Sequence, residues 1–428
     1  MTKKWYLLVV LMLIGALTLA ACGGGDTEEP ADSGDDTTNG DTTMDDGDDH
    51  DDDDDHSDGD DHDDDLAGTV ELWHAYGTGG AEEEAITAIV ASIQEEHPEL
   101  TINVLQIPFD QIFNKWETEV AAGSGPDMFI APNDDLGNLS RSGLVLDITD
   151  LLDGKLENVV DTGVAGMMVD GQMYGVPESA KAVALYYNKS MVDTPPTTTD
   201  ELLQAVEDGH ILVQNQNGYH LFGFFPAFGG QILDDAGTTA CSSGEEGFVK
   251  AMQYLVDLKE AGALYETDGG RADTLFRNGE VAMIINGPWT LGDYRADLGD
   301  DLGVAPIPGS MNPAGALNGI DGFYINPNTD NPELAVAVAL ELTDQESSQM
   351  YTDMAGHVPI RTDVTSDDPN VAAFAEASAN GTPRPQSAAF GNYWGPFGDM
   401  VTKVLEGNVT PEEGVAEACG NFQAAIDG

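Results

Sequence analysis

The chain has 428 residues, of which 78 are acidic and 15 basic, and its formal net charge is −63 at pH 7. This excess of negative charge excludes a nucleic-acid-binding surface, which needs the opposite sign, and it disfavours contact with anionic lipid. The excess is not confined to one segment, because 56 of the acidic and 13 of the basic residues lie beyond position 65.

The N-terminus has the pattern of a secretory signal peptide. Lys3 and Lys4 precede an apolar run over residues 5–19, shorter than the ~20 residues that span a bilayer. The following Leu19-Ala-Ala-Cys22 resembles the bacterial lipobox, in which the cysteine becomes the lipidated first residue of the mature protein. We therefore expect residues 1–21 to be removed and Cys22 to anchor an extracytoplasmic protein to the outer face of the cell membrane. The alternative is an ordinary signal peptide with an incidental cysteine.

Residues 22–66 are rich in Asp, Gly and Thr and carry almost no apolar side chain. Such a segment cannot bury enough apolar surface to offset its ordering entropy, so we expect a disordered linker. His50, His56 and His62 recur in this acidic run. The closing Glu and flanking helices of a calcium-binding EF-hand are missing, which favours a solvated spacer over a metal site.

Two cysteines, Cys241 and Cys419, remain after Cys22 is assigned to lipid. An exported protein can form a disulfide, and an even pair suggests one, but the sequence leaves the pairing open.

The body of about 360 residues is too long for one ordinary core, which predicts two lobes. Hydrophobic periodicity predicts alternating strands and helices at its start, with strands over 69–73, 101–105 and 127–131 and helices over 81–96 and 111–122. This βαβαβ order predicts a parallel sheet covered by helices on both faces. Further along we expect a strand over 281–285 and helices over 247–258, 332–342 and 411–425.

Aromatic, carboxylate and carboxamide residues follow the predicted strands, where parallel α/β sheets bind ligands. Aromatic rings suit the apolar faces of a sugar, and carboxylates suit its hydroxyls. The aromatic candidates are Trp73, Tyr76, Tyr219, Trp289, Tyr324, Tyr393 and Trp394. The Gly- and Pro-flanked Trp289 and Trp394 favour a ligand cleft, whereas core packing is an equal alternative for Trp73 and Tyr324.

The sequence contains few motifs that are typical of enzymes. The chain has no H-E-x-x-H, no G-x-S-x-G and no Walker-type Gly-Lys-Ser/Thr. Gly77-Thr-Gly-Gly80 opens a predicted helix and could present amides to an anion, although it lacks the lysine of a phosphate-binding loop. Paired carboxylates suggest a glycosidase as an alternative, but Asp134 and Asp135 are adjacent in sequence and need not flank one bond.

Several strings in order resemble the maltose/maltodextrin-binding family of ABC-transporter solute-binding proteins. They are Gly123-Ser-Gly-Pro-Asp127, Ala131-Pro-Asn-Asp134-Asp-Leu-Gly137, Tyr174-Gly-Val-Pro177, Leu185-Tyr-Tyr-Asn-Lys189, Phe276-Arg-Asn-Gly-Glu-Val-Ala-Met283, Ile285-Asn-Gly-Pro-Trp289 and Tyr393-Trp394. The resemblance implies an α/β, two-lobed, periplasmic-binding-protein-like fold. Each lobe would hold a mostly parallel sheet with helices on both faces, and the ligand cleft would lie between the lobes.

The resemblance also implies lobe borders and partners. The N-terminal lobe would comprise residues 67–180 plus 319–366, and the C-terminal lobe residues 181–318 plus 367–428. A monomer without cofactor would bind an oligosaccharide, close on it by hinge motion and deliver it to the permease subunits of an ABC importer. The lipid anchor would be its only membrane contact.

Matched position by position, Asp134 corresponds to the family's sugar-binding aspartate, and Tyr219, Trp289 and Trp394 to its stacking aromatics. The chain departs from the pattern at Lys181, which replaces an acidic ligand, at Ala131, which replaces a tryptophan, and at Asn217, which replaces a glutamate. We expect four residues to compensate: Tyr76, Asp135, Glu178 and Asp321. Trp73 and Tyr393 complete the candidate ligand set. Because of these departures, another solute such as a polyamine, or a cell-surface carbohydrate-active enzyme, stays an alternative.

Overall fold

In the computed structural model, residues 66–428 are described, and they form two α/β lobes. The expected signal peptide, Cys22 and the Asp/His-rich segment lie outside these residues. Within residues 66–428, every helix is too short or too polar to cross a membrane.

The first sheet has the strand order β13-β6-β12-β3-β1-β2, with β14 beside β12. Its strands are β1 (Gly68–His74), β2 (Leu100–Gln106), β3 (Met128–Pro132), β6 (Val176–Lys181), β12 (Leu317–Ile325), β13 (Val358–Pro359) and β14 (Thr382–Pro383). β1 pairs in parallel with β2 and β3, which confirms the predicted βαβαβ unit. β12 runs antiparallel to β3 and β6, because it returns from the second lobe, to which β6 leads. The sheet is therefore mixed rather than mostly parallel.

The second sheet has the order β11-β7-β10-β8-β9. Its strands are β7 (Ala184–Asn188), β8 (Leu212–Asn215), β9 (Leu264–Glu266), β10 (Met283–Asn286) and β11 (Leu302–Ala305). β8 is parallel to β9 and β10, whereas β7 is antiparallel to β10 and β11. This sheet is mixed as well. A short hairpin of β4 (Met168–Val169) and β5 (Gln172–Met173) stands apart from both sheets.

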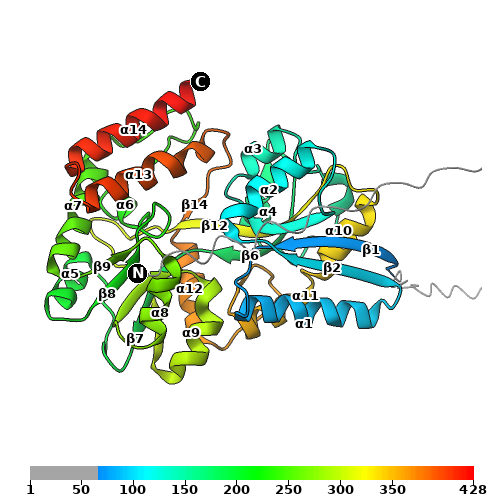
Figure 1. The fold of residues 1–428 in the computed structure, drawn as a ribbon, viewed down its shortest axis with the longest axis horizontal. Helices are drawn as coiled ribbons and strands as arrows, with labels where there is room; N and C mark the ends of the chain where they lie inside the picture. Colours follow the sequence, from blue (N-terminus) through cyan, green and yellow to red (C-terminus); the bar gives the residue numbers. More distant parts are fainter. Residues whose placement is uncertain (1–65) are drawn as a thin grey trace, which may run out of the picture. The chain divides into compact units, whose positions relative to one another are not determined.

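Helices lie on both sides of the first sheet, with α1 below its strands and α2, α3 and α4 above them in Figure 1. The helical segments of this lobe are α1 (Ala81–Glu96), α2 (Phe109–Ala121), α3 (Leu136–Arg141), η1 (Thr149–Leu152), α4 (Asp161–Gly166), α10 (Pro332–Glu341), α11 (Gln345–Met350) and the π-helical turn η4 (Tyr351–Ala355). The bounds of α1 are those predicted, because its apolar stripe of Ile86, Ile89, Val90 and Ile93 is buried against the lobe.

The second lobe holds the remaining helical segments of residues 66–428. They are α5 (Thr199–Glu207), α6 (Phe224–Ala227), α7 (Glu246–Ala261), α8 (Gly269–Arg277), η2 (Pro288–Thr290), α9 (Leu291–Leu298), η3 (Gly299–Asp301), α12 (Pro369–Ala379), η5 (Phe390–Tyr393), α13 (Trp394–Leu405) and α14 (Pro411–Asp427). α14 begins at the predicted Pro411, because Thr410 and Glu413 form a capping box there and proline suits the first turn of a helix.

A disulfide joins Cys241 to Cys419, with their Cα atoms 5.9 Å apart. The pairing that the sequence left open is therefore made in the structure. It ties the loop before α7 to α14, and both cysteines are buried in the core of the second lobe.

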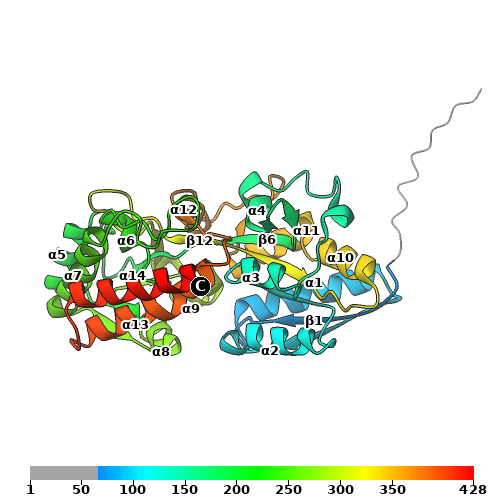
Figure 2. The same cartoon turned by 90° about the horizontal axis from the view of Figure 1, so that it is seen from above.

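The chain crosses between the sheets at three places. β6 leads to β7 through residues 182–183, residues 306–316 lead from β11 to β12, and residues 360–368 lead from β13 to α12, which packs on β11 of the second sheet. β14 follows α12 and pairs with the start of β12. Figure 2 shows β6 and β12 where the two groups of helices meet. β6 extends to Lys181, and β12 begins at Leu317.

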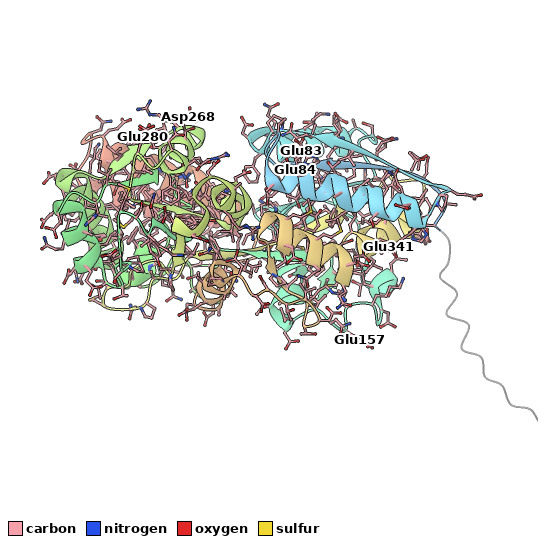
Figure 3. The ribbon with its side chains drawn as sticks, turned by 90° about the horizontal axis from the view of Figure 1, so that it is seen from below. Glu83, Glu84, Glu157, Asp268, Glu280 and Glu341 are labelled. Atoms are coloured by element: carbon pink, nitrogen blue, oxygen red, sulfur yellow. A yellow bond between two sulfur atoms is a disulfide. The ribbon has the colours of Figure 1, made fainter. Side chains whose placement is uncertain are left out.

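Acidic side chains cover the outer surface of both lobes. Glu84 and Glu157 are exposed on the first lobe, and Asp268 and Glu280 on the second (Figure 3). The negative charge of the body is thus solvated on both lobes.

Candidate functional site

Three aromatic side chains of the second lobe form what we call the aromatic wall: Tyr219, Trp289 and Trp394. The Tyr219 ring centroid lies 6.0 Å from that of Trp289 and 6.4 Å from that of Trp394. Trp289 follows β10 directly, and its ring occupies the space beside Gly287, where a β-carbon would lie 1.9 Å from the ring. The glycine thus allows the ring to fold back toward Tyr219. Three aromatics predicted to stack on a ligand are brought together.

Arg384 connects the aromatic wall to the predicted aspartate of the first lobe. Its guanidinium forms an ion pair with Asp134, and its Nη1 also approaches Asn133 Oδ1 at 3.4 Å. The guanidinium carbon lies 5.3 Å from the centroid of the Tyr219 ring and 5.8 Å from that of Trp394. A cation over aromatic faces gains a favourable cation–π contact. The pair therefore places a carboxylate and a guanidinium directly against the aromatic wall.

Arg384 is buried, and burial lowers its pKa to about 9. It is still protonated at neutral pH, where Asp134 supplies its counter-charge. Its Nε and the nearby Gln386 Oε1 are buried without a hydrogen-bond partner among the described residues. Buried polar atoms are nearly always paired in folded proteins, so these two unpaired atoms are exceptions that call for an explanation.

Next to the aromatic wall lies a buried group of five ionisable residues, here called the Lys181 network. Its members are Glu82 of α1, Glu178 and Lys181 of β6, Asp321 of β12 and His357 before β13. Lys181 Nζ lies 2.9 Å from Glu82 Oε1, 3.3 Å from Asp321 Oδ2 and 3.1 Å from His357 Nε2. His357 also contacts Glu178 at 2.8 Å and Glu82 at 2.7 Å. Lys181, the departure from the family pattern, is thus fully neutralised by neighbouring carboxylates.

Mutual attraction overcomes burial at most of these groups. Burial disfavours the charged form of His357, but Glu178 and Glu82 raise its pKa to about 9. Burial alone would raise the pKa of Glu82, yet Lys181 and His357 lower it to about 2. Asp321 is the exception, because burial raises its pKa to about 6 despite Lys181. Its Oδ1 is buried without a hydrogen-bond partner among residues 66–428.

Tyr76, Glu178 and Asp321, predicted to compensate for Lys181, all gather at the Lys181 network. The Tyr76 ring lies edge-on to His357, with centroids 6.0 Å apart. The network touches the aromatic wall through Tyr219, whose hydroxyl donates to the backbone oxygen of Lys181 at 3.4 Å.

Three other predicted residues are not part of the aromatic wall, although the Tyr393 ring packs edge-on against Trp394, with centroids 5.1 Å apart. Trp73 is buried in the first lobe, with Lys115 Nζ 4.0 Å from its ring centroid. Tyr393 is fully buried, stacks on Phe397 and donates to the backbone oxygen of Gly218 at 2.7 Å. Its hydroxyl and its ring face therefore have partners within the protein, so the structure gives this ring a packing role instead of a free stacking face.

Asp135 is half-buried at the start of α3, where its Oδ1 accepts from Asn138 Nδ2 at 2.6 Å. Burial raises its pKa. Its carboxylate thus serves the local structure of α3 rather than the pair of Asp134 and Arg384.

Sequence reasoning missed Arg384, Glu82 and His357. One signal was available for Arg384: it is among only 13 basic residues of the body and stands between Pro383 and Pro385. The following Pro385 restricts Arg384 to an extended backbone conformation, but this local pattern does not predict that the side chain is buried. His357 and Glu82 come from distant parts of the chain, and no local pattern joins them.

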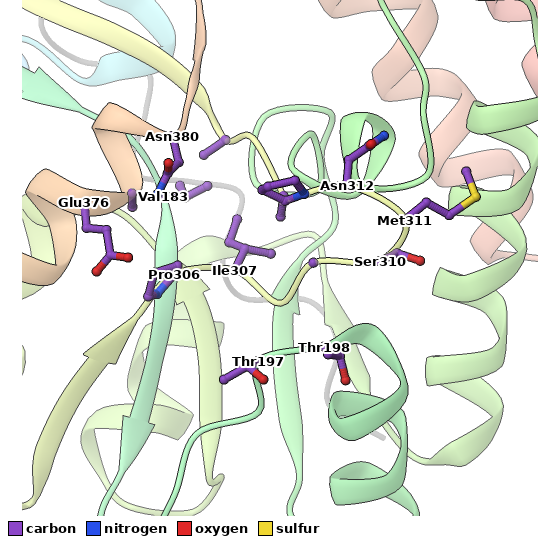
Figure 4. A pocket seen from close by; sticks show the side chains of 15 residues that line it. Val183, Thr197, Thr198, Pro306, Ile307, Ser310, Met311, Asn312, Glu376 and Asn380 are labelled. Carbon is purple, nitrogen blue, oxygen red and sulfur yellow. The ribbon is translucent and has the colours of Figure 1, made fainter.

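A separate cavity of about 360 Å³ lies within the second lobe. Figure 4 shows Thr197 and Thr198 on one side, Ile307 and Met311 on the connecting loop, and Glu376 on α12. None of the predicted ligand-binding residues lines it. The candidate site is therefore the aromatic wall with Asp134 and Arg384, not this cavity.

Two α/β lobes, three crossings between them and a polar-aromatic site shared by both define a two-lobed solute-binding protein. The chain belongs to the bacterial extracellular solute-binding proteins, whose family model matches residues 88–380. Membership places the protein among extracytoplasmic binding proteins.

Similar proteins support the resemblance read from the motifs. The maltotriose-binding protein of Pyrococcus abyssi is 26% identical over 366 residues, covering 79% of this chain and 78% of that protein. The galactooligosaccharide-binding protein of Bacillus subtilis is 23% identical, covering 81% and 87%. The structure of the Thermus thermophilus maltotriose-binding protein with maltotriose matches with a TM-score of 0.77 and 28% identity, over 83% of this chain and all of that one. These relatives are binding proteins rather than enzymes, and the two-lobed fold is confirmed.

Proposed function

We propose that this protein captures an oligosaccharide of the maltodextrin type for an ABC importer. The observation that carries the proposal is the aromatic wall facing the ion pair of Asp134 and Arg384. Relatives named for maltotriose and galactooligosaccharide binding support the same ligand class.

The site suits the chemistry of a sugar. The rings of Tyr219, Trp289 and Trp394 would cover the apolar C–H faces of successive units. Asp134 and Arg384 would bond hydroxyls at the rim, and such hydrogen bonds to charged groups contribute about 1.5–3 kcal/mol each. The free Arg384 Nε adds one donor that has no partner in the described residues. A few of these contacts plus stacking supply the ~8 kcal/mol of micromolar binding.

The charges at the site argue against a polyamine. A polyamine is recognised by carboxylates that are free to pair with its ammonium groups. Here Asp134 is paired with Arg384, and both Glu82 and Asp321 are paired with Lys181.

A glycosidase is disfavoured for a related reason. Hydrolysis needs a protonated acid and a free carboxylate on opposite sides of the scissile bond. His357 and Lys181 lower the pKa of Glu178 and of Glu82, and Asp134 forms an ion pair with Arg384. We expect no reducing sugar to be released from maltodextrins.

The anchor and the borders of the lobes complete the proposal. Cys22 would carry the lipid, and the acidic linker would let a monomeric receptor reach its permease. The lobes would comprise residues 67–180 plus 319–366 and residues 181–318 plus 367–428. A Cys22→Ala variant should be released into the medium, whereas the wild type stays with the membrane fraction.

A binding screen by calorimetry and thermal shift tests the ligand class. The ligands are maltose, maltotriose, trehalose, a cyclodextrin and spermidine. We expect a maltodextrin to bind at micromolar concentration and to raise the melting temperature by mass action. A response to spermidine alone would refute the proposal.

A further inference from the structure

Helix α9 of the second lobe bonds to the ends of two helices of the first lobe. Asp293 Oδ1 accepts a hydrogen bond from the backbone N–H of Ala81, the first residue of α1, at 3.2 Å. Two residues further on, Arg295 Nη2 donates to the backbone oxygens of Asp353 at 2.8 Å and Met354 at 3.1 Å, at the end of η4. A helix carries partial positive charge at its N-terminus and partial negative charge at its C-terminus. The carboxylate and the guanidinium therefore each meet a helix end of opposite sign.

The N-terminus of α1 depends on this distant carboxylate. Gly80 stands at the capping position and has no side chain to accept from the first amides. Glu83 Oε2 bonds instead to the N–H of Gly79, at 2.6 Å. The Gly77–Gly80 turn, which the sequence suggested could present amides to an anion, gives its Gly79 amide to Glu83, and the next free amide, that of Ala81, bonds to Asp293 of the other lobe.

Two glycines allow α9 to approach this closely. A β-carbon at Gly292 would lie 2.5 Å from Ala81 Cβ and 2.7 Å from the backbone oxygen of Met354. Gly356 has φ of +82°, and a β-carbon there would lie 2.7 Å from Leu291 of α9. Larger side chains at either position would force α9 away from the first lobe.

We infer that Asp293 and Arg295 are positioning residues for sugar binding: together they latch α9 onto the first lobe and so retain the bound sugar. α9 follows Trp289 within two residues, and Ala81 precedes Glu82 of the Lys181 network. The latch therefore sets how far the aromatic wall lies from the first lobe. Asp368, which pairs with Arg295 Nη1 at 3.0 Å, holds the guanidinium in place. This inference rests on the proposed function, because it concerns the arrangement that holds the sugar.

Stopped-flow tryptophan fluorescence with maltotriose tests the latch in Asp293→Ala and Arg295→Gln. Loss of a helix cap costs about 1 kcal/mol, which corresponds to about fivefold faster dissociation in each variant, with the association rate unchanged. Asp297→Ala is the matched control, because Asp297 lies on the same helix and pairs with Arg277 inside the second lobe. Dissociation rates equal to wild type in both latch variants, or an equal acceleration in Asp297→Ala, would overturn the inference.

Gly292→Trp separates failure of the latch from failure of the proposed function. Small-angle scattering should give this variant a larger radius of gyration than wild type, with and without maltotriose. If wild type binds none of the sugars tested, the proposed function fails, yet the latch still predicts this expansion of the ligand-free protein. An unchanged radius of gyration in a folded Gly292→Trp variant would refute the latch.

Discussion

Arg384 holds its guanidinium against the carboxylate of Asp134 while lying over the rings of Tyr219 and Trp394. The backbone N–H of Arg384 also donates to the oxygen of Asn318 at 3.0 Å, so the residue sits on a crossing between the lobes. One side chain thereby links the predicted ligand residues of both lobes.

Replacing Arg384 with Gln should weaken maltotriose binding by about 10- to 100-fold, because one or more charged hydrogen bonds to the sugar are lost. Calorimetric titration measures the dissociation constant. Arg271→Gln is the control, since Arg271 is exposed and pairs with Glu266 in the second lobe. An unchanged dissociation constant in Arg384→Gln would show that the guanidinium does not touch the ligand.

Replacing Asp134 with Asn should reduce stability as well as affinity. It leaves the buried Arg384 without its counter-ion, and breaking a buried ion pair costs about 3–5 kcal/mol. Adding Arg384→Gln should restore part of the free energy of unfolding, because both charges are then gone. Denaturant unfolding of the two single variants and the double variant measures this coupling; additive losses would contradict it.

The two neighbours Tyr393 and Trp394 should respond differently to substitution. Trp394→Ala removes a ring of the aromatic wall and should weaken maltotriose binding by about tenfold, on the scale of 0.5–1.5 kcal/mol for an aromatic contact plus lost area. Tyr393→Phe removes only the bond to Gly218, so it should lower the free energy of unfolding by about 1 kcal/mol and leave binding unchanged. Calorimetry measures binding and denaturant unfolding measures stability in both variants. If Tyr393→Phe weakened binding and Trp394→Ala did not, Tyr393 would be the ligand contact and Trp394 the packing residue.

Helix α1 and the βαβαβ order could be predicted from the sequence, because local patterns of apolar residues determine them. Trp289 was readable too, since its neighbours Gly287 and Pro288 mark a turn directly after a strand. Glu82 and His357 could not be joined, because 275 residues separate two side chains that meet at 2.7 Å. The flanking Gly395 and Pro396 favoured Trp394 for the ligand cleft, but no local pattern assigned Tyr393 to the core. One packs on Phe397 and the other lines the aromatic wall because they point in different directions from adjacent residues.

Breaking the disulfide should destabilise the protein without changing its ligand affinity. Cys241 and Cys419 close a loop of 178 residues, and removing such a link costs about 2–4 kcal/mol, chiefly through the unfolded chain. The double variant Cys241→Ser/Cys419→Ser should therefore melt at a lower temperature, as should reduced wild type. Reduction should leave the melting temperature of the double variant unchanged. Equal melting temperatures for the oxidised wild type and the double variant would show that the link adds no stability.

The free energy of unfolding should fall at alkaline pH, because His357 of the Lys181 network loses its proton there. Because Glu178 and Glu82 raise the pKa of His357 to about 9, its charged form stabilises the fold fully below about pH 6.5. That contribution is lost as the pH rises through 9, on the order of 3 kcal/mol for the whole shift. Asp321, with a pKa raised to about 6, acts at lower pH, where its ionisation reduces stability.

At acidic pH, protonation of Glu82 should lower the free energy of unfolding. Its pKa is lowered to about 2, so its contribution is present above about pH 4.5 and lost as the pH falls toward 2. His357→Gln should therefore remove the decline from pH 6.5 to 9 and keep a smaller decline from pH 4 to 2.5, because Lys181 still lowers the pKa of Glu82. Denaturant unfolding at pH 2.5, 4, 6.5 and 9 measures both declines. His210→Gln, a substitution outside the network, should reproduce the wild-type profile. Parallel declines from pH 6.5 to 9 in wild type and His357→Gln would mean that another group sets the alkaline limit.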